Sequence, residues 1–168
     1  MEALKGIMKN GETSDGLLWR EAQHQVTLSE ALDFLFGSTQ YRQLAVEAFL
    51  WLQKLIPYRC GVRWGKDRIT FLVGNYRPAA IKRDAGKLRI DMGFAGEIPD
   101  AFKVASDVWK TIDAREGYVI VERMPLPLSN VDEHSFVVAC ERMREVAPKT
   151  RLWECNVAVE WPKDKPLP

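Results

Sequence analysis

The sequence predicts an α+β fold: one domain over residues 1–168, built from an antiparallel sheet of about five to six strands with about four helices packed mainly on one face. Three observations support this prediction. Residues 58–94 alternate between apolar and polar side chains, as strands with one buried face do. Segments on both sides carry apolar residues three and four apart, which is the helical period. The 168 residues, 46% of them hydrophobic, are enough for one buried core.

Two helices are expected before the sheet region and two after it. The segment Thr27–Glu30 reads Thr-Leu-Ser-Glu and matches a capping box, so a helix should begin there and end at Gly37. The second should run over about 39–56, where apolar residues cover much of the circumference. The later helices are predicted over 99–115 and 132–147, each with one apolar stripe.

The strands are predicted from period-2 alternation and from turn residues. Within 58–94 we expect a meander of three or four antiparallel strands, because Gly-, Asn- and Asp-containing turns interrupt the alternation. Two more strands are expected near 118–124 and 153–161. At the ends of the chain we expect a peripheral hairpin or loop over 1–26 and a flexible tail over 162–168.

The net charge of +1 conceals a segregation along the chain. Residues 58–90 contain nine basic and two acidic side chains, whereas residues 91–147 contain six and eleven. Such an asymmetry can mark a surface that binds anions. No apolar run approaches the roughly 20 residues that span a bilayer, so we expect a cytoplasmic protein with no membrane partner.

The candidate binding residues follow from side-chain parity in the meander. If its apolar residues face the helices, its basic residues lie together on the opposite face, where arginines can bind phosphate oxygens. We therefore predict non-enzymatic binding of nucleic acid or another polyanion, although a solvated sheet face also carries charges for solubility alone. The predicted residues are Arg59, Arg63, Arg68, Lys87 and Arg89 on the face, Lys66, Arg77, Lys82 and Arg83 in or near turns, and Tyr58 and Tyr76 at strand ends as stacking surfaces.

Two other functions remain open from the sequence. The apolar helix over 39–56 carries Trp51 away from its main stripe, which suits a protein-interaction or homo-oligomeric module. A metal-dependent enzyme would need converging acids, for which Asp91 and Glu122 are the candidates. Neither of the two histidines, His24 and His134, has a catalytic motif around it. The cysteines Cys60, Cys140 and Cys155 are too widely spaced for a zinc site, so we predict no catalytic residue, metal or cofactor.

Part of the chain resembles a group of known domains. Its order of elements over 41–146, with the runs AAIKRDAGKLRIDMGF and GYVIVERM, is similar to small prokaryotic α+β domains of unknown function that accompany restriction-type or defence nucleases. The resemblance implies a non-catalytic accessory role or a nucleic-acid-associated role. It covers roughly two thirds of the chain and leaves out the first 40 residues and the last strand.

Overall fold

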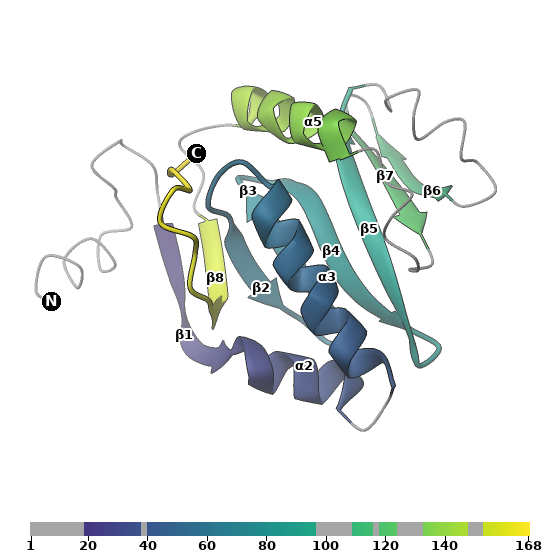
Figure 1. Cartoon of the computed structure of the whole chain (residues 1–168). Helices are drawn as coiled ribbons and strands as arrows, with labels where there is room; N and C mark the ends of the chain where they lie inside the picture. Colours follow the sequence, from purple (N-terminus) through teal and green to yellow (C-terminus); the bar gives the residue numbers. More distant parts are fainter. Residues whose placement is uncertain (1–18, 38–39, 97–108, 116–117, 124–132, 148–152) are drawn as a thin grey trace, which may run out of the picture.

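The protein is an α+β structure with two sheets (Figure 1). The computed structural model describes the backbone of residues 19–37, 40–96, 109–115, 118–123, 133–147 and 153–168. Its helices there are α2 (Leu28–Phe36), α3 (Tyr41–Leu55) and α5 (Glu133–Val146). The predicted class and the antiparallel sheet are confirmed, while the counts differ: the described residues form three helices, and eight strands in two sheets.

The larger sheet has six strands in the order β2-β3-β4-β5-β7-β6, and every neighbouring pair is antiparallel. Its first four strands are the predicted meander, and tight turns connect them. The strands are β2 (Gly61–Trp64), β3 (Arg68–Val73), β4 (Tyr76–Asp84), β5 (Lys87–Ala95), β6 (Trp109–Arg115) and β7 (Tyr118–Arg123).

The helix predicted over 99–115 is wrong in its second half. Trp109–Arg115 is strand β6, which pairs with β7 from Trp109↔Arg123 to Arg115↔Tyr118; residues 99–108 lie outside the described part of the chain. Only Glu116 and Gly117 separate the two strands in sequence, and a two-residue connection ending in glycine is typical of a β-hairpin. The apolar spacing of this segment suggested a helix, but pairing with β7 decides its structure.

The second sheet pairs a strand from the first part of the chain with a strand from the last part. Strand β1 (Trp19–Thr27) pairs in parallel with β8 (Trp153–Ala158), and β8 lies beside the edge strand β2 (Figure 1). The first 18 residues, which contain most of the predicted peripheral hairpin, lie outside the described residues. The last strand, predicted over 153–161, begins at Trp153 but already ends at Ala158.

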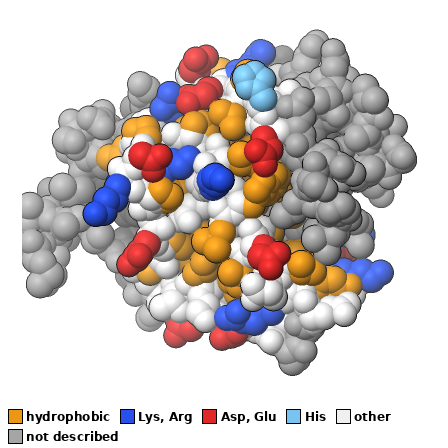
Figure 2. Space-filling model, in the orientation of Figure 1, with side chains coloured by type: hydrophobic (Ala, Val, Ile, Leu, Met, Phe, Trp, Pro, Cys, Tyr) orange, Lys and Arg blue, Asp and Glu red, His pale blue; other side chains and the backbone are white. Residues whose placement is uncertain are grey.

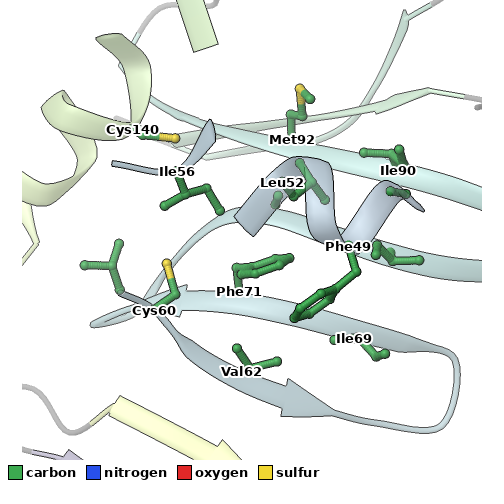
Figure 3. Packing of buried hydrophobic residues seen from close by; sticks show 14 of the residues in the cluster. Phe49, Leu52, Ile56, Cys60, Val62, Ile69, Phe71, Ile90, Met92 and Cys140 are labelled. Carbon is green, nitrogen blue, oxygen red and sulfur yellow. The ribbon is translucent and has the colours of Figure 1, made fainter. Parts of the chain in front are cut away.

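The core lies between one face of the large sheet and the helices. Helix α3 crosses this face, and Phe49 stacks on Phe71 of β3 with ring centroids 5.0 Å apart (Figures 1 and 3). Phe136 and Met143 of α5 are buried in the same cluster. The predicted capping box at the start of α2 is present: Glu30 N–H donates to Thr27 Oγ1 at 3.1 Å, and Thr27 N–H donates to Glu30 Oε2 at 2.7 Å.

The C-terminal segment contacts the region just before β2. Arg59 N–H donates to the Pro166 carbonyl at 2.9 Å, and the Lys165 ammonium donates to the Lys54 carbonyl at the end of α3. Leu167 packs against the core. The flexibility predicted for 162–168 stays a prediction. Among the described helices, none has the length and apolar character needed to cross a membrane.

Candidate anion-binding surface

Three basic residues on three adjacent strands lie directly opposite one another. Arg68 of β3 is the register partner of Lys82 of β4, and Lys82 is the partner of Arg89 of β5. All three lie on the sheet face that is turned away from α3, because Ile69, Ile81 and Ile90 beside them point into the core. We call Arg68, Lys82 and Arg89 the basic row.

The two ends of the basic row are already engaged with acids. The Arg68 guanidinium makes a two-point contact with Asp67, with Nε to Oδ1 at 2.9 Å and Nη2 to Oδ2 at 3.0 Å. Arg89 Nη1 forms an ion pair with Asp84 Oδ2. The hydrogen bonds from Arg68 hold the pKa of the Asp67 carboxyl below its usual value. Nevertheless, the side chains of Arg68 and Arg89 are 27% and 30% exposed, so a ligand can reach both.

A buried carboxylate lies next to the basic row. Asp91 of β5 is only 4% exposed, and neither of its oxygens accepts a hydrogen bond from any residue that the structure describes. Arg68 Nη1 lies 3.8 Å from Asp91 Oδ2, and the residue of β4 opposite Asp91 is the small Ala80. Burial raises the pKa of the Asp91 carboxyl, while the positive charges of Arg68, Lys82 and Arg77 oppose part of that rise.

Three other predicted residues lie around the basic row, and a fourth, Arg77, lies near the opposite end of β4. Lys66 in the β2–β3 turn and Lys87 at the start of β5 are exposed at the same end of the sheet. Arg63 of β2 is exposed too. It lies on the same face, because its register partner is Thr70, two residues after Arg68 on β3. Arg77 is half-buried on β4. These four residues and the basic row make up most of the predicted set.

Arg83 is at the same end of the sheet but faces the helices. Its Nη1 donates to the carbonyl of Leu35 in α2 at 3.5 Å, and its guanidinium lies over the Phe34 ring, 5.9 Å from the centroid. The Phe34 ring meets Trp64 edge to face on the helix side of β2. Arg83 therefore anchors α2 to the sheet and is not part of the basic row.

Three predicted residues lie elsewhere. Arg59 precedes β2, where strand parity no longer applies, and its Nε donates to the Lys165 carbonyl at 2.8 Å. Tyr76 packs against the core. Tyr58 is fully buried, and its hydroxyl donates to the Cys140 carbonyl at 2.9 Å. The expectation that Tyr58 offers a stacking surface is therefore wrong.

The middle of the outer sheet face is not open to solvent. Thr70, Leu72, Ala80 and Asp91 all point to this face, yet they are only 1%, 6%, 2% and 4% exposed. Strand parity correctly gave the outward direction of Thr70 and Asp91, but it carries no information about what covers them. The candidate surface is therefore the basic row with its neighbouring turns. Figure 2 looks onto the opposite, helix-covered face, where acidic and basic side chains are intermingled.

The residues behind the other two functions also have definite positions. Trp51 donates its indole N–H to Glu133 Oε1 of α5 at 2.9 Å, so it links two helices of the same chain. Asp91 and Glu122 are register partners on β5 and β7, as a site built from both would require. His134 is exposed at the start of α5. Within the described residues, no group of three or more metal-binding side chains occurs.

Comparison with known proteins adds no assignment, since no family model, curated protein or solved structure matches the chain. The resemblance to defence-associated domains therefore stays a prediction. The geometry of the basic row is the evidence on which a function can be built.

Proposed function

We propose that this protein binds a polyanion through the basic row, and that the polyanion is a nucleic acid. The observation that carries the proposal is the alignment of Arg68, Lys82 and Arg89 in one register across three strands. Like charges directly opposite on neighbouring strands destabilise a sheet. Asp67, Asp84 and Asp91 offset part of this repulsion, and a bound polyanion would offset the rest.

The dimensions of the basic row suit a chain of phosphates. Neighbouring strands are about 4.8 Å apart, so the row extends over about 10 Å of the sheet surface. Arginine can bind a phosphate through two parallel hydrogen bonds, and lysine adds a point charge. The contacts to Asp67 and Asp84 are partly exposed ion pairs, which contribute little to stability, so phosphate oxygens can replace them at small cost.

Titration of a labelled oligonucleotide at several salt concentrations tests this proposal. With three phosphate contacts, the logarithm of the binding constant should fall against the logarithm of salt concentration with a slope of about −2 for a single strand and about −3 for a duplex. Lys82→Ala should weaken binding of every nucleotide sequence to a similar extent. It should also make the salt dependence less steep, by the amount expected for the loss of about one phosphate contact. An unlabelled heparin competitor separates a preference for nucleic acid from general polyanion binding.

Lys163→Ala is the matched control, since it removes one exposed lysine from the C-terminal segment, away from the row. It should leave affinity and slope unchanged. If Lys82→Ala and Lys163→Ala lost the same amount of affinity, binding would depend on the net charge of the protein and not on the basic row. No salt-sensitive binding at low ionic strength would refute the proposed function.

A further inference from the structure

We propose that Asp91 is the internal counter-charge of the basic row, and that it takes up a proton when phosphate groups bind there. The inference rests on the proposed function, and it identifies a residue that regulates the same site. It follows from two features of Asp91: a buried carboxylate that accepts no hydrogen bond from the described residues, and a position beside cations of β3 and β4.

The first feature is how Asp91 is held. An ionised carboxylate in a protein interior normally accepts several hydrogen bonds, which fix its charge. Both oxygens of Asp91 are buried without one from the described part of the chain, and the cationic atom Arg68 Nη1 is 3.8 Å from Oδ2, beyond hydrogen-bonding distance. The negative charge of Asp91 is therefore stabilised by the field of its neighbours and not by direct bonds.

The second feature is the set of charges around Asp91. Arg68 on β3, Arg77 and Lys82 on β4 favour the ionised form, and Asp67 in the β2–β3 turn opposes it. Two further charged residues are close in the sheet: Arg89 two positions earlier on β5, and Glu122, the register partner on β7. The cations that stabilise Asp91 thus include two members of the basic row.

A bound phosphate changes this balance in one direction. It neutralises Arg68 and Lys82 and adds negative charge close to a carboxylate that burial already disfavours. The neutral acid then becomes the favoured form, and the proton comes from solvent. By linkage, the same coupling makes the affinity for phosphate rise as pH falls, by at most about tenfold per pH unit for one proton.

Calorimetric titration of the full chain with an oligothymidylate of about 12 nucleotides tests the inference, because thymine carries no group that titrates between about pH 5 and pH 8. The binding enthalpy measured in buffers of different ionisation enthalpy gives the number of protons taken up. The wild-type chain should take up as much as one proton and bind more weakly as pH rises. Asp91→Asn should take up fewer protons, show a flatter pH profile, and bind more tightly than wild type at about pH 8.

Asp84→Asn is the matched control, because it makes the same chemical change in a partly exposed partner of Arg89. It should retain the proton uptake. Titration of carboxyl carbon signals by NMR on the wild-type chain gives a second measurement that needs no variant: the Asp91 signal should titrate at higher pH with oligothymidylate bound. Unchanged proton uptake in Asp91→Asn, or an Asp91 signal that does not respond to the oligonucleotide, would overturn the inference while binding itself persisted. Absence of oligonucleotide binding at every pH would refute the proposed function together with it.

Discussion

The side-chain amide of Asn156 pairs with the main chain of Trp64. Trp64 N–H donates to Asn156 Oδ1 at 2.6 Å, and Asn156 Nδ2 donates to the Trp64 carbonyl at 3.0 Å. These two bonds join β8 of the small parallel sheet to β2, the edge strand of the large sheet. The amide takes the place that a neighbouring strand's peptide group would occupy, so the edge of β2 is satisfied at this point.

Replacing Asn156 by alanine should destabilise the protein by about 2 kcal/mol, because a partly buried N–H and carbonyl of Trp64 both lose their partner. Urea denaturation followed by tryptophan fluorescence measures the free energy of unfolding. Asn156→Asp serves as a control: the ionised carboxylate cannot donate to the Trp64 carbonyl, whereas the protonated acid can. The Asp variant should therefore lie closer to wild type at about pH 3 than at about pH 7. Equal stability of Asn156→Ala and wild type would contradict this role.

Truncating Phe49 tests the core between α3 and the sheet. Phe49 is fully buried and stacks on Phe71 (Figure 3), so Phe49→Ala should lower the free energy of unfolding by about 3–5 kcal/mol through lost contacts and the cavity left behind. The neighbouring Leu50 is 53% exposed. Leu50→Ala should change stability by no more than about 0.5 kcal/mol. Similar effects of the two substitutions would mean that α3 does not present this face to the sheet.

Tyr58 offers a test of a buried polar contact. Its hydroxyl donates to the Cys140 carbonyl, which ties the segment before β2 to α5. Tyr58→Phe should destabilise the protein by about 1 kcal/mol, because the ring still fills its site while one hydrogen bond is lost. Tyr58→Ala should destabilise it several times more, by removing a fully buried ring. If the Phe and Ala variants were equally stable, the packing of the ring could not be what holds this residue in place.

The elements that could be predicted from sequence are those whose own residues determine them. The helix over Leu28–Phe36 has a capping box and a terminal glycine, and the meander has alternation and turns inside one short segment. Strand β6 depends instead on pairing with β7, and the parallel pairing of β1 with β8 joins residues more than 120 positions apart. Periodicity within a segment contains no information about such partners.

The same distinction applies to the site. Parity placed Arg68 and Arg89 on one face, and the structure confirms their direction. Arg59 could not be placed, because its partner is the carbonyl of Lys165, far along the chain. The charge pattern also gave no sign that Asp91 is buried, since an aspartate on the outward parity of a strand is ordinarily solvated.

The pH dependence of stability should carry the signature of Asp91. Burial raises the pKa of its carboxyl above that of an aspartate in the unfolded chain, which is about 3.9. The folded state therefore holds the proton more strongly, and the contribution of Asp91 to the free energy of unfolding falls as pH rises from about 4 through the folded pKa. Asp91→Asn removes this loss, so its stability relative to wild type should increase over that pH range and then remain constant.

Asp67→Asn provides a control of opposite sign. Hydrogen bonds from Arg68 lower the pKa of the Asp67 carboxyl, so its contribution to stability is present above the unfolded pKa and disappears as pH falls through the folded one. The Asp67 variant should thus be less stable than wild type near neutral pH and approach it in acid. Urea denaturation between about pH 3 and pH 7 measures both differences. An Asp91→Asn difference that did not grow with pH would show that the folded protein does not disfavour the Asp91 charge.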